Sequence, residues 1–334
     1  MHKIIKLLLV CSCTIILFGC KTETEDKTYK IGIIVYDSYD TFITSIMTEF
    51  QKEVEGYEGF SVEVRDAQQD QLKQNEQVKE LLELGCDVIC VNLVDRTAPK
   101  KIIDMAKQAD VPIIFFNREL VEEDLLTWTK LYYVGARAKE SGQFEGEIAV
   151  EACKQEGVDK NNDGVIQYVM LEGEAGHQDT TVRTDVSIST MEGEGIALER
   201  LTAALANWNR QEAQTKMNQF LQEFGDSIEL VISNNDDMAL GAIDALETSG
   251  IDEKDWPEIV GIDGTRVGLQ AVKEGKMFGT VYNDFEGQAL AMAKLASSLA
   301  QGLSLSSFQM EGEKYIFLPY KKVTQENVDD YLED

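Results

Sequence analysis

The chain has 334 residues, of which 43% are hydrophobic and 27% charged, a composition typical of soluble globular proteins with room for two domains. Its formal net charge is −29 at pH 7. Phosphate backbones and anionic lipid head groups repel such an acidic chain, which argues against nucleic acid as a partner. The chain has only two histidines, so no Cys/His metal cluster is expected.

Residues 1–19 have the pattern of a secretory signal. Two lysines precede an apolar run that is too short to span a bilayer comfortably. The run ends in LFGC, which resembles a bacterial lipobox, so Cys20 is predicted to be lipidated and to become the first mature residue. An uncleaved anchor with an incidental cysteine is the alternative. Residues 20–29 are polar and predict a tether, which places the domains at the extracytoplasmic face of the cell membrane.

Three of the six cysteines remain in the body of the chain, at Cys86, Cys90 and Cys153. This odd number, without the spacing of a disulfide framework, argues against structural disulfides despite the predicted export. The first two flank or lie within a predicted buried strand. We therefore interpret them as small core hydrophobes.

From residue 30 the chain alternates between short apolar runs and amphipathic helices. The runs predict buried strands at 31–36, 86–93, 111–116, 165–171, 228–233, 258–263 and 278–283. Helical faces between them contain Phe42, Ile46, Phe50 and Val54 in the first helix, and Ala213, Met217, Phe220, Leu221 and Phe224 before a stop at Gly225. The alternation predicts two doubly wound, Rossmann-like α/β domains with parallel sheets covered on both faces.

Polar side chains follow most of the apolar runs, at the strand ends where ligands of such folds bind. Each could simply cap the next helix, which is the commoner role of Asn or Asp after a strand. Their joint appearance in both halves favours a binding site. The set comprises Asp40, Asn117, His177, Asp179, Arg183, Asn235, Asp263 and Asn283.

This set contains carboxylates, amides, one Arg and one His, but no evident nucleophile. It suits a neutral ligand with many hydroxyls, because each hydroxyl donates to a carboxylate and accepts from an amide or guanidinium. Aromatic residues are then expected against the apolar faces of a pyranose ring. Phe42 and Trp208 are the candidates, with helix core and a partly buried surface anchor as the respective alternatives.

The segment VDKNNDGVIQYVML, residues 158–171, begins like an EF-hand loop. Oxygen-bearing residues occupy alternating positions and a glycine follows, but Met170 stands where the motif has Glu, and a strand follows in place of a helix. An Asx-rich turn without metal is the alternative.

The sequence resembles the periplasmic D-galactose/D-glucose-binding proteins of bacterial ABC importers, within the type I sugar-binding family, over about residues 30–320. The resemblance rests on many clustered motifs. They are DQLKQNEQ (70–77), VNLVD (91–95), VPIIFFNRE (111–119), YYVG (132–135), LEGEAGHQDTTVRT (171–184), SNNDDMALGAIDAL (233–246), VGIDG (260–264) and GTVYND (279–284).

The resemblance implies two sugar-binding lobes, 30–136 plus 284–317 and 137–283 plus 318–334, joined by crossings near residues 136, 283 and 317. It implies ten sugar contacts: the eight polar residues above form a hydrogen-bonding ring, and Phe42 and Trp208 stack on opposite faces of the pyranose. The family assigns Asp40 to the hydroxyl that distinguishes galactose from glucose. Trp208 follows LTAALAN in place of the turn of the best-known members.

The resemblance also completes the calcium loop, because in this family a Glu from a distant segment supplies the last ligand. The implied ligands of a structural Ca²⁺ are Asp159, Asn161, Asp163, the carbonyl of Val165, Gln167 and Glu229.

The expected function is that of a monomeric, lipid-anchored receptor, not an enzyme. It captures D-galactose or D-glucose, closes about a hinge, and delivers the sugar to an ABC permease. A sugar sensor that presents its closed form to a chemoreceptor or histidine kinase is the alternative. A glycosidase using Asp40 and Asp263 and a sugar-responsive repressor core are further alternatives. The resemblance opposes the first, and the predicted signal and the acidic charge oppose the second.

Overall fold

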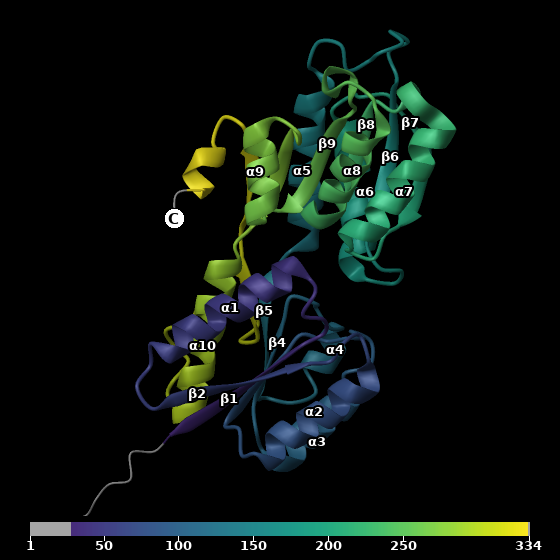
Figure 1. The fold of residues 1–334 in the computed structure, drawn as a ribbon. Helices are drawn as coiled ribbons and strands as arrows, with labels where there is room; N and C mark the ends of the chain where they lie inside the picture. Colours follow the sequence, from purple (N-terminus) through teal and green to yellow (C-terminus); the bar gives the residue numbers. More distant parts are fainter. Residues whose placement is uncertain (1–27, 333–334) are drawn as a thin grey trace, which may run out of the picture.

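Two six-stranded sheets divide the chain into two lobes, which are stacked end to end in Figure 1. The computed structural model describes residues 28–332. The predicted signal, Cys20 and most of the predicted tether lie outside the described residues. Within them, none of the helices has the length and apolarity to cross a bilayer.

The first lobe, called the N-lobe, contains a wholly parallel sheet in the order β11-β5-β4-β3-β1-β2. Its strands are β1 (Tyr29–Val35), β2 (Phe60–Asp66), β3 (Val88–Val91), β4 (Ile113–Phe116), β5 (Leu131–Ala136) and β11 (Tyr315–Leu318). Its helices are α1 (Thr41–Glu55), α2 (Gln71–Glu83), α3 (Lys100–Ala109), the short α4 (Glu122–Leu125) and α10 (Phe285–Gln301).

The second lobe, called the C-lobe, contains the sheet β12-β10-β9-β8-β6-β7. Its strands are β6 (Ile166–Glu172), β7 (Leu198–Leu205), β8 (Leu230–Ser233), β9 (Glu258–Asp263), β10 (Gly279–Asn283) and β12 (Tyr320–Thr324). Its helices are α5 (Ala138–Cys153), α6 (Gln178–Gly193), α7 (Arg210–Phe224), α8 (Asp236–Ser249) and α9 (Arg266–Glu274), with single 3₁₀ turns at Gly225–Ser227, Glu253–Asp255 and Val328–Tyr331.

Each sheet buries both faces, as the near-continuous apolar strands predict. In the N-lobe, α1 and α10 cover one face and α2 and α3 the other (Figure 1). In the C-lobe, α5 and α6 cover one face, whereas α7, α8 and α9 cover the other. The fold class predicted from the sequence is thereby confirmed.

The predicted helical faces are the packed faces. Phe42, Ile46, Phe50 and Val54 of α1 are at most 5% exposed. In α7 the residues Ala213, Met217 and Phe220 are buried, and Gly225 ends the helix at a φ of 52°, a conformation that favours glycine.

Three short connections join the lobes. They lie at Arg137 between β5 and α5, at Asp284 between β10 and α10, and at Pro319 between β11 and β12, next to the boundaries inferred from the sequence. Because β11 leaves the N-lobe at the cleft, β12 enters the C-lobe from its cleft side and runs antiparallel to β10. This single antiparallel pair departs from the parallel sheet expected there.

The cysteines of the described region are free thiols. Cys86 and Cys90 are 2% and 0% exposed and pack in the N-lobe cores, so the prediction of core hydrophobes is confirmed. Burial raises the pKa of the Cys86 thiol to about 11, which keeps it protonated and unreactive at neutral pH.

Candidate functional site

The carboxyl ends of the strands in both lobes face one another and enclose a cavity. Nine of the ten predicted sugar contacts line it: Asp40, Phe42, Asn117, His177, Asp179, Arg183, Trp208, Asn235 and Asp263. The cavity measures about 30 Å³, and a second cavity of about 290 Å³ shares Asp40 and Trp208 with it. The lobes are in contact beside it, since Arg118 of the N-lobe pairs with Glu174 of the C-lobe at 2.8 Å.

Asn283, the tenth predicted residue, does not line this cavity. It lies behind Asp263, 2% exposed, where its Nδ2 donates to Asp263 Oδ1 at 3.4 Å. Its own Oδ1 accepts from Gln288 Nε2 at 2.7 Å. In this conformation Asn283 therefore supports Asp263.

Helix capping and cavity lining turn out to be compatible roles. Asp40, His177 and Asn235 are the N-caps of α1, α6 and α8. Each accepts one backbone N–H, from Ile43 at 3.0 Å, Asp179 at 3.1 Å and Met238 at 3.0 Å, respectively. A cap uses one acceptor atom of the side chain, which leaves the rest of the group for a ligand.

Three cavity residues have a backbone conformation that side chains other than glycine rarely adopt. Asn117 has a φ of 60°, Trp208 of 63° and Asp263 of 117°. Each such residue costs about 1–3 kcal/mol, a strain that clusters at functional sites. This backbone conformation directs the three side chains into the cleft, and no local sequence pattern predicts it.

The indole of Trp208 is held between a histidine and a glycine. Its ring packs edge-on against His177, with centroids 5.2 Å apart at 75°. A Cβ at Gly173 would overlap the indole, so the absence of a side chain there makes room for the ring. Trp208 is 9% exposed, and its Nε1 has no hydrogen-bond acceptor among the described residues. A buried donor of this kind is available to a ligand or an ordered water molecule.

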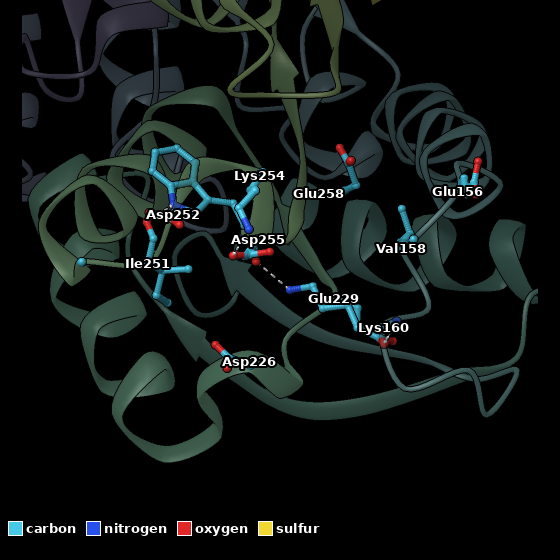
Figure 2. Close-up of a pocket in the computed structure, with 13 residues that line it drawn as sticks. Glu156, Val158, Lys160, Asp226, Glu229, Ile251, Asp252, Lys254, Asp255 and Glu258 are labelled. Atoms are coloured by element: carbon cyan, nitrogen blue, oxygen red, sulfur yellow. Dashed lines mark hydrogen bonds and ion pairs between the residues drawn. The ribbon is translucent and has the colours of Figure 1, made fainter.

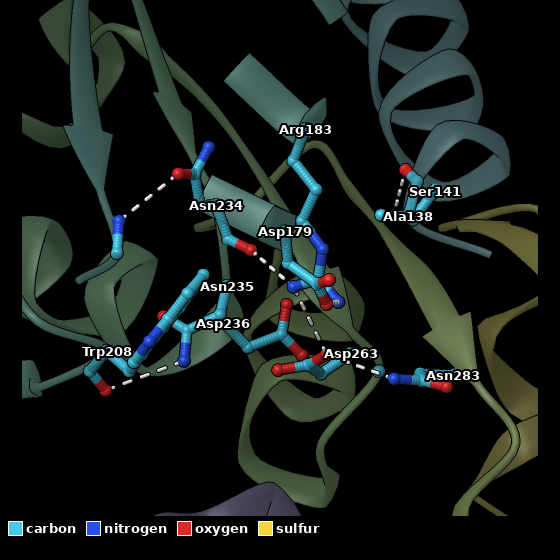
Figure 3. A network of polar contacts seen from close by, with 12 residues as sticks. Ala138, Ser141, Asp179, Arg183, Trp208, Asn234, Asn235, Asp236, Asp263 and Asn283 are labelled. Atoms are coloured by element: carbon cyan, nitrogen blue, oxygen red, sulfur yellow. Dashed lines mark hydrogen bonds and ion pairs between the residues drawn. The ribbon is translucent and has the colours of Figure 1, made fainter. Parts of the chain in front are cut away.

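Arg183 forms the polar floor of the cavity on the C-lobe side. Its Nη2 lies 3.2 Å from Asp179 Oδ2, and its Nη1 lies 3.7 Å from Asp263 Oδ1 and donates to the Asn234 carbonyl at 2.8 Å (Figure 3). Burial raises the pKa of Asp263 well above its usual value, and the Arg183 charge opposes this shift. The Arg183 guanidinium is thus a fixed donor among the oxygen acceptors of Asp179, Asp263 and the Asn234 carbonyl.

Phe42 and Trp208 approach the cavity from opposite lobes. Phe42 also packs in the N-lobe core and is 5% exposed, so its core role and its place at the cavity coexist. The cavity therefore has one aromatic wall from each lobe and a ring of polar groups between them. Such walls suit the two apolar faces of a sugar ring.

Sequence reasoning missed one lining residue, Arg118. It follows Asn117 directly in the VPIIFFNRE motif, but a charged residue after a strand end has the ordinary interpretation of a solvated side chain. In the structure it is 4% exposed.

The segment from Asp159 to Gln167 folds into a turn of mutually bonded oxygen groups. Asn161 Nδ2 lies 2.9 Å from Asp163 Oδ2 and 3.2 Å from Gln167 Oε1, so two acceptors converge on one point. The Glu229 carboxylate, 1% exposed, accepts the N–H groups of Lys160 at 2.6 Å and Gln167 at 2.9 Å. Hydrogen bonds thus connect five of the six predicted ligands, Asp159, Asn161, Asp163, Gln167 and Glu229. Their side-chain oxygens are of the hard type that calcium prefers. Within residues 28–332 no cluster of three His, Cys, Asp or Glu residues is arranged for a metal.

A cavity of about 590 Å³ lies in the C-lobe beside this turn and is lined by none of the ten predicted sugar contacts (Figure 2). Lys160 crosses it, and its Nζ donates to the carbonyls of Ile228 at 2.8 Å and Asp255 at 3.0 Å. These bonds tie the turn to the segment before β9.

Comparison with known proteins agrees with this geometry. The model of the periplasmic binding protein domain matches residues 31–304. The chain is 36% identical over 311 residues to the D-galactose/methyl-galactoside binding periplasmic protein MglB of Haemophilus influenzae, covering 91% of this chain and 92% of that one. It is 30% identical to a putative rhizopine-binding protein of Rhizobium meliloti, with 93% and 94% covered.

Among solved structures, an ABC transporter solute binding protein from Bacillus halodurans with bound myo-inositol superimposes with a TM-score of 0.78 at 32% identity, covering 92% of this chain and 99% of that one. The chain belongs to the periplasmic binding protein family. Its relatives bind and carry ligands and catalyse no reaction, which confirms that the protein is not an enzyme.

A substitution at Gly173 tests the packing of Trp208. Gly173→Ala is expected to displace the indole and to lower the free energy of unfolding by about 1–3 kcal/mol, because the new methyl group overfills a packed contact. Urea unfolding gives the free energy, and near-ultraviolet circular dichroism follows the indole.

Gly193→Ala is the matched control, because a Cβ there meets no atom within 4 Å. Equal spectra and stabilities for the two variants would show that the indole does not depend on Gly173.

His177 predicts a specific pH dependence of stability. Burial lowers its pKa to about 3 in the folded protein, whereas the unfolded chain has a histidine pKa of about 6.5. Below pH 6.5 the unfolded state takes up the proton and the folded state does not. Stability is therefore complete above this pH and falls as pH decreases toward 3, by about 1.4 kcal/mol per pH unit.

The measurement is urea unfolding of the wild type and His177→Gln between pH 7 and 4.5. The variant is expected to lose less stability over this interval, while the carboxylates titrate alike in both proteins. Parallel curves for the two proteins would contradict the buried neutral imidazole.

Proposed function

We propose that this protein captures D-galactose, D-glucose or both in the cavity between its lobes and delivers the sugar to an ABC permease. The observation that carries the proposal is the convergence on one cavity of nine residues whose types match the sugar contacts of the galactose/glucose-binding family. The relative from Haemophilus influenzae, which binds D-galactose and methyl-galactoside, supports the same ligand class.

The chemistry of the cavity supports a neutral, hydroxylated ring. Arg183 and Asn117 donate, Asp40, Asp179 and Asp263 accept, and Trp208 offers an unpaired N–H. A polar site of this kind rejects analogues that lack a matching hydroxyl, because its buried groups would lose their partners. Relatives that bind ribose or xylitol use the same fold, so the choice of sugar rests on these side chains.

Binding on this proposal requires the lobes to open. In the present conformation, side chains of the two lobes bridge the cleft at Arg118–Glu174 and Arg96–Gln178, and only three short connections join the lobes. Entry of the sugar into an open form, followed by closure around it, lets both lobes contribute contacts. The sugar shifts the equilibrium by the difference in its affinity for the two forms.

The closed form is the state that a partner would recognise. Delivery to a permease is the primary proposal, with the protein acting as a monomer tethered through lipidated Cys20 at the extracytoplasmic face of the membrane. Presentation of the closed form to a chemoreceptor or histidine kinase uses the same binding chemistry and is the second candidate.

We also propose that the turn formed by Asp159, Asn161, Asp163, Val165 and Gln167, with Glu229, holds a structural Ca²⁺. The convergence of oxygen groups around Asn161 Nδ2 supports this site, because rotation of that amide would turn its oxygen toward the same point. A bound ion would stabilise the C-lobe, and it takes no part in sugar binding.

A titration by calorimetry tests the sugar assignment. D-galactose or D-glucose is expected to bind with micromolar affinity or better, whereas D-ribose is not. Asp40→Asn is expected to weaken hexose binding roughly ten- to hundred-fold, because a buried hydroxyl loses a charged acceptor.

Asp104→Asn, which breaks only the exposed pair with Lys100, is the matched control and should bind like the wild type. Failure of a folded, calcium-loaded protein to bind either hexose would refute the galactose/glucose assignment and leave the fold intact.

Chelation tests the calcium site. EDTA is expected to lower the Tm of the wild type and added Ca²⁺ to restore it, since an ion at a hundred times its Kd adds about 2.7 kcal/mol of stability. Glu229→Gln should abolish most of the calcium-dependent shift, whereas the exposed Glu223→Gln in the same lobe should retain it. A Tm that does not respond to EDTA in the wild type would rule out the proposed ion.

A further inference from the structure

Arg118 is the one residue of the cavity wall that the ten predicted contacts do not include. It follows Asn117 at the end of β4, where the positive φ of Asn117 turns the chain. Its side chain is 4% exposed. A cation buried to this extent needs specific partners, and its partners lie in both lobes.

Contacts within the N-lobe fix the guanidinium in place. It stacks on the Tyr36 ring, 3.6 Å from the centroid, and its Nη1 donates to the Val94 carbonyl at 2.9 Å. Because Tyr36 and Val94 belong to the same lobe as Arg118, opening of the cleft leaves these contacts intact. The group is therefore preorganised before a ligand arrives.

The same tyrosine connects Arg118 to Asp40. The Tyr36 hydroxyl donates to Asp40 Oδ2 at 2.7 Å, and the carboxylate also caps α1. Burial raises the pKa of Asp40, whereas its hydrogen bonds and the Arg118 charge lower it. An ionised carboxylate only accepts and a guanidinium only donates, so the two groups together match a hydroxyl, which does both.

A second contact of Arg118 crosses the cleft. Its Nη2 lies 2.8 Å from Oε1 of Glu174, which belongs to the C-lobe and is 28% exposed. This pair exists only when the lobes are together. In an open form the Glu174 carboxylate would return to water, whereas Arg118 would keep its N-lobe contacts.

The structure contains a second bridge between the lobes that does not reach the cavity. Arg96 Nη2 donates to Gln178 Oε1 at 2.7 Å, and neither residue lines the cavity. Arg96 therefore offers a comparison in which closure is affected and the ligand contact is not.

We propose that Arg118 is an additional binding residue, which donates to the same ligand hydroxyl that Asp40 accepts from, and that its pair with Glu174 couples this contact to closure of the lobes. The inference rests on the proposed function for the class of ligand. It adds a specificity-determining residue, Arg118, and assigns to it the ligand hydroxyl that donates to Asp40.

The test measures calorimetric affinities of the wild type, Arg118→Met, Asp40→Asn, Arg96→Met and Glu174→Gln for D-galactose, D-glucose, myo-inositol and D-allose, and for the monodeoxy analogues of whichever ligand binds. Arg118→Met is expected to weaken binding of the parent ligand at least about tenfold. Asp40→Asn is expected to abolish the preference for the parent ligand over one monodeoxy analogue. Arg118→Met should abolish the preference over that same analogue.

Arg96→Met and Glu174→Gln are expected to weaken all analogues by one common factor, since they change closure alone. Stopped-flow measurements should show that Glu174→Gln releases the ligand several-fold faster, because removing the charge from a partly buried ion pair that forms only on closure acts chiefly on the dissociation rate. If Arg118→Met proves unfolded, Arg118→Lys retains the charge without the planar fork and should lose part of the same discrimination.

If the Arg118 variants lose affinity for all analogues by the same factor, Arg118 only stabilises the N-lobe, and the proposed contact is overturned. An unchanged dissociation rate in Glu174→Gln would overturn the coupling. Binding of myo-inositol or D-allose without either proposed hexose would refute the proposed function, while Arg118 would still be tested on the bound ligand. Absence of all binding would overturn both.

Discussion

The burial of Arg183 is the constraint on which the C-lobe half of the site depends. A guanidinium 3% exposed needs specific partners, and the two Nη atoms receive them from separate elements: Asp179 of α6, Asp263 of β9, the Asn234 carbonyl after β8 and the Tyr320 hydroxyl of β12. Its buried Nε has no partner among the described residues. Loss of any one leaves a buried charge short of a partner, which costs several kcal/mol. The single cation thereby fixes the ends of three strands and one helix around the cavity.

The N-lobe half of the site also contains a buried cation, Arg118. Arg118 stacks on Tyr36, whose hydroxyl donates to Asp40, whereas Arg183 pairs directly with Asp179. Each lobe therefore presents a donor and an acceptor to the cleft. Neither half encloses a ligand alone. On the proposed function, recognition and closure are one process, and the affinity for a ligand includes the free energy of bringing the lobes together.

Much of this arrangement could be predicted from the sequence, because hydrophobic periodicity identifies helices and strands and the position of polar residues after strands indicates the site. Apolar runs and helical faces identified the two α/β lobes. Polar residues after strands identified seven cavity residues, and the expectation of aromatic walls for a sugar ring identified Phe42 and Trp208. The rest depends on tertiary geometry. The positive φ of Trp208, the void at Gly173 and the place of Asn283 behind Asp263 have no local signature. Arg118 could not be predicted, because only its burial distinguishes it from a solvated arginine, and burial is not visible in the residue type.

The most direct test of a ligand held between two lobes is the distance between them. Spin labels at Leu72→Cys on α2 and Leu205→Cys on β7, both exposed and on different lobes, report this distance by pulsed electron resonance once the half-buried Cys153 is replaced by Ser. Closure around the sugar predicts a broad or two-component distribution of distances without ligand and a single shorter distance at saturating hexose. A distribution that stays the same when hexose binding is complete would contradict closure around the sugar.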